Sequence, residues 1–156
     1  MNDEAEKQAK LTQRSKRSPL TPHLSPLIFP SMFKIAEHPN ELNFATNGLA
    51  EVVVNGKKIC VGQVGTMSGN MEADRLSVRL FACASACPHA GARMANGQID
   101  ALGNIICPLH RYKFSLVNGR NVSGEGYHLK TWKVEWREDG VWVEIPQDNT
   151  GVWHNF

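Results

Sequence analysis

The chain has 156 residues, 42% of them hydrophobic, which is enough for one domain with an apolar core. The formal net charge is +2, and beyond residue 30 basic and acidic residues are equal in number, twelve of each. This neutral body argues against nucleic acid as a partner. No run of about 18 apolar residues occurs, so no membrane-spanning helix is predicted.

The first 31 residues are polar and then rich in proline, which predicts a disordered or loosely ordered tail. Residues 1–30 carry five basic and three acidic side chains, charges that are usually just solvated but that can touch an acidic surface. Because the N-terminal segment lacks the apolar stretch of a secretory signal, we expect a cytoplasmic protein.

The pattern from residue 33 to residue 61 is that of short strands. Residues 33–36 predict a strand, and residues 37–42 predict a single helical turn. Residues 50–54 and 57–61 predict a hairpin, because Asn55-Gly56 between them suits a two-residue type I′ turn.

The next segments lead towards the middle of the chain. Residues 63–75 are rich in glycine, serine and charge, and they predict a long exposed hairpin loop. Residues 76–82 alternate apolar with polar side chains and predict a strand. Cys60 and Cys83 lie in apolar, strand-like runs, so we expect both to be small buried hydrophobic residues.

The C-terminal half continues the same pattern. Residues 104–106 and 113–117 predict two strands. Apolar residues alternate with polar ones over 132–136 and 141–145, on either side of the turn Glu138-Asp139-Gly140, which predicts a hairpin with one buried face. Many short strands with turn signals predict an all-β sandwich or barrel.

Two short Cys–His pairs lie within 24 residues of each other: Cys87-Pro88-His89 and Cys107-Pro108-Leu109-His110. Because the order alternates Cys, His, Cys, His, each of two loops can present one thiolate and one imidazole to a shared inorganic centre. Two cysteines can then hold one iron of a [2Fe–2S] cluster while two histidines hold the other, the mixed ligation of a Rieske centre.

Two other interpretations of these residues stay open at this point. Cysteine and histidine also bind zinc, although zinc fingers group Cys with Cys and His with His instead of interleaving them. Alternatively, the four residues are ordinary core cysteines and histidines whose hydrogen bonds are satisfied within the protein. That explanation suits any one of them better than it suits four in two pairs, each with its own proline.

The segment from Cys87 to Gly119, CPHAGARMANGQIDALGNIICPLHRYKFSLVNG, resembles the two cluster-binding loops of Rieske [2Fe–2S] proteins, most closely the small Rieske-type ferredoxins. The resemblance implies a Rieske fold, in which an antiparallel β-sandwich or barrel base carries a small two-loop cluster-binding subdomain. It covers residues 32–146 and leaves a tail at 1–31 and a C-terminal extension at 147–156. It also implies one [2Fe–2S] cluster with four ligands: Cys87, His89, Cys107 and His110.

Departures from the high-potential Rieske subunits of respiratory complexes predict a low reduction potential. Those subunits have a disulfide between the loops where this chain has Ala92 and Leu109. They also have a serine and a tyrosine hydroxyl near the cluster sulfurs where this chain has Tyr112 and Phe114. Fewer hydrogen-bond donors disfavour the added negative charge of the reduced cluster, so we expect a potential towards the low end of the Rieske range.

The resemblance also bears on catalysis. Rieske oxygenases carry a further domain whose mononuclear iron is held by two histidines and a carboxylate. About 46 residues follow His110, and the remaining histidines form no His-x-x-x-His pair: His23, His38, His128 and His154. We therefore expect an electron-transfer component without its own substrate site, and not an enzyme in itself.

The leading functional hypothesis is a soluble ferredoxin that passes single electrons from a flavin-dependent reductase to an oxygenase. The alternative is a small Rieske-fold subunit of a larger reductase, such as a nitrite reductase. A cluster-based redox sensor ranks third, because no DNA-binding helix or basic face supports it.

The flanks of the histidine ligands suggest where a partner docks. Ala90, Pro108 and Leu109 form an apolar collar in the sequence. Arg111 stands where Rieske-type ferredoxins commonly have glycine, and Arg93 and Lys113 are near it in sequence. These charges are either ordinary solvated groups or groups that steer an acidic partner.

Overall fold

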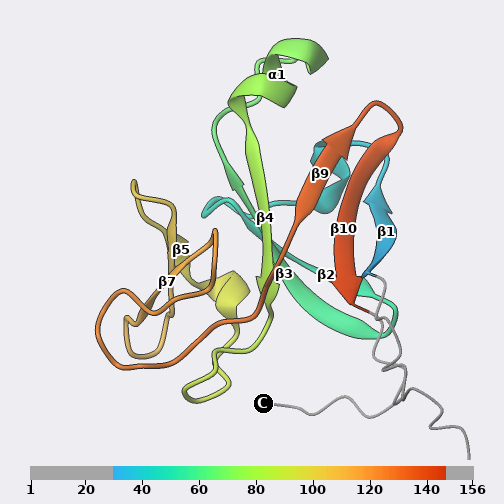
Figure 1. The fold of residues 1–156 in the computed structure, drawn as a ribbon. Helices are drawn as coiled ribbons and strands as arrows, with labels where there is room; N and C mark the ends of the chain where they lie inside the picture. The colour runs from blue at the N-terminus through green and yellow to red at the C-terminus, as the bar shows by residue number, and fades with distance from the viewer. Residues whose placement is uncertain (1–29, 147–156) are drawn as a thin grey trace, which may run out of the picture.

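The computed structural model describes residues 30–146 of the chain. Within this range, ten antiparallel β-strands form three sheets (Figure 1). Apart from Pro30 and Ser31, the predicted tail and the C-terminal extension lie outside these residues. The helical elements in this range are short: α1 (Met71–Ser77), η1 (Pro39–Leu42) and η2 (Met94–Asn96). The all-β prediction is confirmed, and none of the helices in this range is long and apolar enough to cross a membrane.

The first sheet has the order β1-β10-β9, with β1 at Pro30–Ala36, β10 at Gly140–Pro146 and β9 at Val134–Arg137. The predicted C-terminal hairpin is confirmed, since Val141 pairs with Trp136 across a tight turn. β1 begins three residues earlier than the predicted strand at 33–36, because Pro30 already pairs with Pro146 of β10.

The second sheet has the order β2-β3-β4-β8, and its strands are Leu49–Val54, Lys57–Val64, Arg79–Ala84 and Thr131–Trp132. Asn55 and Gly56 both have positive φ, 49° and 76°, so the β2–β3 hairpin has the predicted type I′ turn. Trp132, predicted to belong to the C-terminal hairpin, instead pairs with Ala82 of β4. The chain passes from the second sheet to the first between β8 and β9, and the alternation of apolar and polar residues continues across this point. The sequence pattern therefore does not indicate that one strand ends and another begins there.

The predicted exposed loop at 63–75 is wrong, because α1 begins at Met71 and extends beyond the end of β4 (Figure 1). Asn70 caps this helix by accepting hydrogen bonds from the backbone N–H groups of Glu72 and Ala73. The buried Asp74 carboxylate accepts hydrogen bonds from the segment that precedes the cap. The predicted strand at 76–82 is shifted accordingly: its first residues belong to α1, and β4 starts at Arg79.

The third sheet has the order β5-β6-β7, with strands at Gln98–Ile99, Asn104–Ile106 and Lys113–Ser115. It forms a small subdomain on one side of the molecule, and the first sheet lies on the other (Figure 1). The predicted strand at 104–106 is confirmed, and the one at 113–117 ends two residues early.

Strand β3 connects the two halves because it is buried on both faces. Ile59 and Val61 pack into a first core with Val141 and Val143 of the first sheet. Cys60, between them in sequence, points to a second core shared with the small subdomain: Leu49, Cys60, Cys83, Cys87, Met94, Ile105, Cys107, Phe114, Leu116 and Leu129. Cys60 and Cys83 are each 1% exposed, as predicted for small buried hydrophobic residues. The second core ends at the two predicted ligand loops.

Candidate metal centre

The two Cys–His segments fold into a pair of similar loops, defined here as loop 1 (residues 87–92) and loop 2 (residues 107–112). In loop 1 the Cys87 N–H donates to the Ala92 carbonyl at 2.8 Å, and in loop 2 the Cys107 N–H donates to the Tyr112 carbonyl at 2.8 Å. Each cysteine carbonyl in turn accepts from the N–H four residues later, that of Gly91 or Arg111. Each loop is thus fixed at the cysteine by two backbone hydrogen bonds.

The fourth residue after each cysteine adopts a left-handed backbone conformation. Gly91 has a φ of 70°, and Arg111 at the equivalent position of loop 2 has a φ of 62°. Glycine adopts this conformation freely, whereas a residue with a side chain is strained there by about 1 kcal/mol. Arg111 therefore occupies a position whose backbone favours glycine.

The structure brings the four predicted ligands together as two pairs, a thiol pair and an imidazole pair, and no group of three or more metal-ligating side chains forms among residues 30–146. The Cys87 and Cys107 thiols are buried at 2% and 1% exposure, facing the second core. The imidazole rings lie further out: His89 is half-buried, His110 is exposed, and the ring centroids are 4.6 Å apart. The site has two thiols on the inside and two imidazoles on the outside.

Several polar groups at this site suit a metal cluster. The Nδ1 atom of His89 is buried and has no hydrogen-bond partner among the described residues, so it is available as a ligand. Burial raises the pKa of the Cys87 thiol, backbone N–H groups of His89 and Ala90 oppose the rise by donating to the sulfur, and the adjacent Cys107 thiol adds to it. Metal ligands bind as thiolates, so insertion of a cluster at Cys87 releases a proton. These donors fit a [2Fe–2S] group.

Two tyrosines surround the imidazoles, and the sequence reasoning missed one of them. The ring of Tyr112 lies 4.7 Å from that of His89, and the ring of Tyr127 lies 5.0 Å from it. The two tyrosine rings also stack on each other at 5.8 Å. Tyr127 is separated from the ligands by 17 residues and belongs to no ligand spacing, so a lone aromatic residue after two glycines is the only signal that the sequence offers.

The loop that delivers Tyr127 is organised by Asn121. The Asn121 side-chain oxygen accepts hydrogen bonds from three successive backbone N–H groups, those of Ser123, Gly124 and Glu125. The Ser123 hydroxyl accepts from the backbone N–H of Lys113 at 2.9 Å, which ties the loop to β7. This third loop therefore lies against loop 2 and closes the site beside His89.

Of the positions predicted to distinguish this chain from high-potential Rieske subunits, Phe114 belongs to the core that holds the thiols, Ala92 and Tyr112 pack against that core, and Leu109 does not. Phe114 is fully buried in the same core as Cys87 and Cys107, where its ring brings no hydroxyl group. Leu109 is 58% exposed on loop 2, and Ala92 is half-buried on loop 1. All four cysteines of the chain are free, so no disulfide links the loops.

The three basic residues near the loops differ in their surroundings. Arg93 donates to the Glu51 carboxylate, and the Lys113 ammonium lies 3.6 Å from the Asp100 carboxylate. Arg111 is exposed and has no side-chain hydrogen bond or ion pair within residues 30–146. Of the three, Arg111 alone carries a charge that no acidic group in this range balances.

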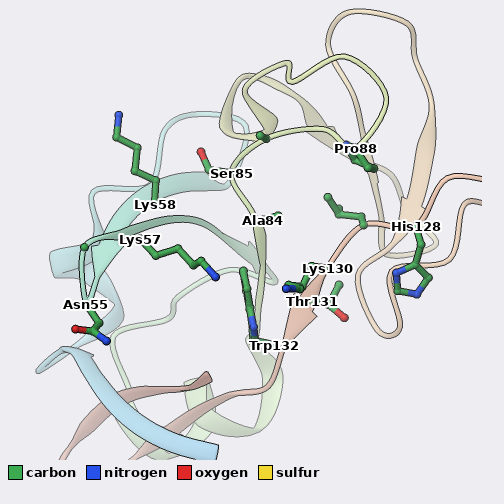
Figure 2. A pocket seen from close by; sticks show the side chains of 13 residues that line it. Asn55, Lys57, Lys58, Ala84, Ser85, Pro88, His128, Lys130, Thr131 and Trp132 are labelled. Atoms are coloured by element: carbon green, nitrogen blue, oxygen red, sulfur yellow. The ribbon is translucent and has the colours of Figure 1, made fainter. Parts of the chain in front are cut away.

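A hollow of about 1000 Å³ lies beside loop 1 (Figure 2), and none of the four predicted ligands lines it. Its walls come from the β2–β3 turn, from the end of β4 with residues 85–88, and from the segment that enters β8. It is separate from the candidate ligand set and contributes nothing to holding a metal.

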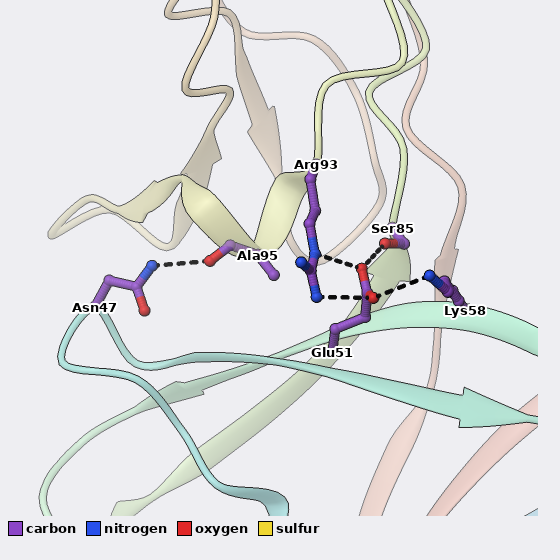
Figure 3. Close-up of polar contacts among 6 residues, drawn as sticks. All are labelled: Asn47, Glu51, Lys58, Ser85, Arg93 and Ala95. Atoms are coloured by element: carbon purple, nitrogen blue, oxygen red, sulfur yellow. Dashed lines mark hydrogen bonds and ion pairs between the residues drawn. The ribbon is translucent and has the colours of Figure 1, made fainter.

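A cluster of polar contacts fixes loop 1 to the base of the molecule (Figure 3). Both oxygens of the Glu51 carboxylate on β2 accept hydrogen bonds from Arg93, each at 2.9 Å, and Ser85 donates to the same carboxylate. Lys58 lies 3.7 Å from it. The Ser85 hydrogen bond and then the Arg93 guanidinium lower the pKa of Glu51. Because Ser85 precedes loop 1 and Arg93 follows it, the Glu51 carboxylate holds both ends of the loop.

The neighbouring Asn47 adds a second link between the base and the subdomain. Its side-chain amide donates to the carbonyls of Ala95 and Gly97, both at 2.9 Å. These carbonyls belong to the η2 segment, which connects loop 1 to β5. Together with the Glu51 contacts, they fix the orientation of loop 1 relative to the second sheet.

Solved structures of other proteins share this fold. The ferredoxin of carbazole 1,9a-dioxygenase from Nocardioides aromaticivorans is 18% identical, with a TM-score of 0.54 over 75% of this chain and 99% of its own. A putative NADH-dependent nitrite reductase small subunit from Mycobacterium tuberculosis is 12% identical, with a TM-score of 0.56 over 78% of this chain and 99% of its own. The predicted Rieske fold is therefore confirmed.

One curated relative has a matching sequence segment. It is the cholesterol 7-desaturase nvd of Bombyx mori, which is 29% identical over 63 residues. That match covers 36% of this chain and spans only 14% of the desaturase. The similarity is thus confined to a short part of a much longer protein.

A family model extends the similarity over most of the described residues. The model of the Rieske [2Fe-2S] domain matches residues 35–133, a range that contains both loops, the second and third sheets and the end of β1. It decides between the cluster and the zinc alternative, since the domain implies one [2Fe–2S] cluster. The chain belongs to the Rieske [2Fe–2S] domain family.

Proposed function

We propose that this chain transfers single electrons between other proteins through a [2Fe–2S] cluster held by Cys87, His89, Cys107 and His110. The observation that carries the proposal is the pairing of two similar loops, which place two thiols inside and two imidazoles side by side outside. When bound, the cluster takes up and releases one electron at a time. The Nδ1 atom of His89, which has no hydrogen-bond partner within residues 30–146, supports its role as a ligand.

The surface around the histidines suits a short-lived contact with a redox partner. Leu109 is 58% exposed, and Ala90 and Pro108 beside it are exposed as well. Electron transfer weakens steeply with distance, so a partner that docks on this apolar collar reaches the cluster through the shortest path, past His89 and His110. Weak electron-transfer encounters bury little surface, so a contact as small as this collar suits one.

The proposed donor is a flavin-dependent reductase, and the proposed acceptor is an oxygenase. Support comes from the fold shared with the ferredoxin of a carbazole dioxygenase, of which this chain covers 99%. The exposed Arg111 adds a charge beside the collar, which favours a partner with an acidic surface.

The fold shared with a nitrite reductase small subunit supports a second candidate, a permanent subunit of a larger reductase. The two candidates differ in how the protein behaves when purified from its own cells. A free carrier elutes from a sizing column at the mass of one chain, whereas a reductase subunit co-elutes with its large subunit.

An electron-transfer assay tests the leading proposal. The loaded protein is placed between an NADH-dependent flavoprotein reductase and an oxygenase, and the rate of cluster reduction is followed by absorbance at several salt concentrations. Arg111→Glu is expected to slow reduction severalfold at low salt without altering the absorption spectrum. The difference from wild type is expected to shrink as salt rises, because screening limits charge steering to about 8 Å at physiological ionic strength. Rates equal to wild type at every salt concentration would exclude Arg111 from docking, and a cluster that no reductase reduces would refute the carrier function.

A further inference from the structure

The hollow beside loop 1 has a distinctly basic lining. Three lysines and one histidine are among its lining residues, Lys57, Lys58, Lys130 and His128, and no aspartate or glutamate of residues 30–146 lines it. The protein as a whole is nearly neutral, with seventeen basic and fifteen acidic residues. Positive charge is therefore gathered in this hollow, which is called the basic groove below.

The floor of the basic groove is apolar. Trp132 of β8, which packs against the first core, and Ala84 of β4, which packs against the second core, both line it. The ammonium of Lys57 lies 5.6 Å from the centre of the Trp132 ring, a cation–π contact that places a positive charge over the floor. The groove thus combines an aromatic floor with a basic rim.

The lysines differ in how far their charges are balanced. Lys58 lies 3.7 Å from Glu51, which compensates part of its charge. Lys130 is exposed, and its side chain has no ion pair or hydrogen bond with any residue of the range 30–146. Lys130 is therefore the side chain of the rim that is most available to an acidic ligand.

The shape favours an extended ligand over a small anion. Figure 2 shows the lysine side chains spread along the groove and pointing in different directions, with His128 at the end opposite Asn55. Lysine ammonium groups that do not converge on one point suit an extended ligand that carries several separated negative charges. Pro88 of loop 1 lines the groove together with Ser85 and Ala86, so a bound ligand lies next to the segment that carries Cys87 and His89.

We propose that the basic groove binds an acidic peptide segment of the redox partner, with an apolar side chain of that segment on Trp132. This inference rests on the proposed electron-transfer function, and it adds a second contact beside the histidine collar. The segment keeps the partner attached while its redox group aligns with His89 and His110. Nucleic acid is a weaker match, because the body is nearly neutral and the groove offers one aromatic ring.

The test is a binding titration with a fluorescein-labelled oligoglutamate peptide that contains one central phenylalanine. The protein is the full-length, cluster-loaded chain in which glutamine replaces the five basic residues of the N-terminal segment, so that these cannot bind the probe: Lys7, Lys10, Arg14, Lys16 and Arg17. In this background Lys130→Glu is compared with Arg79→Glu, a matched control at the other end of β4. Fluorescence anisotropy reports the dissociation constant.

Lys130→Glu is expected to weaken peptide binding roughly fivefold or more, and Arg79→Glu is expected to leave it unchanged. Equal weakening by both variants, or no binding to the unmodified groove, would overturn the inference. Tighter binding of a labelled single-stranded oligonucleotide of equal charge would overturn it in favour of nucleic acid.

Failure of this inference is distinguishable from failure of the proposed function. The absorption spectrum of each sample shows whether the [2Fe–2S] cluster is present before the peptide is added. A loaded, redox-active protein that ignores the peptide would refute the groove alone, whereas a chain that takes up no cluster would refute the carrier function.

Discussion

Phe114 lies fully buried in the core that also holds Cys87 and Cys107, so this side of the proposed cluster has no hydroxyl donor. We expect a reduction potential in the lower half of the Rieske range of about −150 to +300 mV. Phe114→Tyr is expected to raise it, since a hydrogen bond that favours the reduced state by about 1 kcal/mol corresponds to roughly 40 mV.

Protein-film voltammetry measures these potentials directly. Phe114→Leu is the control, because it changes the packing without adding a hydroxyl and is expected to leave the potential near that of wild type. A wild-type value near the top of the range would contradict the role assigned to the missing donors.

A second residue-scale prediction concerns Arg111, whose φ of 62° falls in the region that favours glycine. Arg111→Gly relieves this strain and is expected to stabilise the protein by about 1 kcal/mol, a rise of a few degrees in melting temperature. Gly91→Ala at the equivalent position of loop 1 is expected to do the reverse. Melting followed by circular dichroism checks both, and a less stable Arg111→Gly variant would contradict the strain assignment.

Individual side chains were predictable from the sequence only where spacing identified them. The Cys–His spacing identified the four candidate ligands. The structure places the two histidine rings 4.6 Å apart and buries the two cysteines in one core, but no group of three or more metal-ligating side chains forms within residues 30–146. Tyr127 was missed because its contact with His89 depends on the loop that Asn121 organises, and no sequence motif indicates that loop. The partners of Arg93 and Lys113 were equally hidden, since Glu51 is 42 residues from Arg93.

At the scale of elements, the Glu51 carboxylate holds both ends of loop 1. Glu51→Gln removes the charge that Arg93 and Ser85 bind, and it is expected to destabilise the protein by about 1 kcal/mol and to shorten the half-life of the bound cluster severalfold. Bleaching of the cluster absorbance during incubation at moderate temperature measures that half-life.

The matched control is Glu135→Gln. Glu135 on β9 also binds two basic side chains, Lys133 and Arg137, but it lies in the first sheet. It is expected to leave the half-life of the cluster unchanged, and equal losses in both variants would show that Glu51 has no special role in holding loop 1.

The contribution of Glu51 also depends on pH. The pKa of Glu51 in the folded protein lies below the ordinary value of 4.5 because of Ser85 and then Arg93. As the pH falls, the unfolded chain therefore binds a proton at a higher pH than the folded protein does. The stabilisation is therefore complete above about pH 4.5 and is lost as the pH falls through the lower folded pKa. Wild type and Glu51→Gln are expected to differ most in melting temperature at neutral pH and to converge in acid, and a constant difference across this range would contradict the assignment.

Elements with strong local signals were predicted well, and those set by tertiary contacts were not. Asn55-Gly56 fixed the β2–β3 turn, because both residues tolerate positive φ. Helix α1 was missed, although Asn70 is a good cap, because its glycine- and serine-rich surroundings are typical of loops. The placement of Trp132 in β8 depends on pairing with β4 and leaves no mark on the apolar alternation.

At the scale of the whole molecule, two cores share strand β3, and the second of them ends at the cysteines. The cluster site therefore rests on a buried base, while the histidines, the collar and the basic groove face outward. The all-β class and the two-loop subdomain followed from strand patterns and resemblance. The positions of the basic groove and of the Glu51 contacts did not, because both depend on how distant strands pack.

The most direct test of the proposed ligation is the electron paramagnetic resonance spectrum of the reduced protein, recorded with its iron and labile sulfide content. We expect a brown protein with two irons and two sulfides per chain, and a low average g value from a cluster with two histidine ligands. His110→Ala is expected to abolish that signal. A colourless protein carrying one zinc, or an unchanged signal in His110→Ala, would contradict the assignment of Cys87, His89, Cys107 and His110 as the ligands.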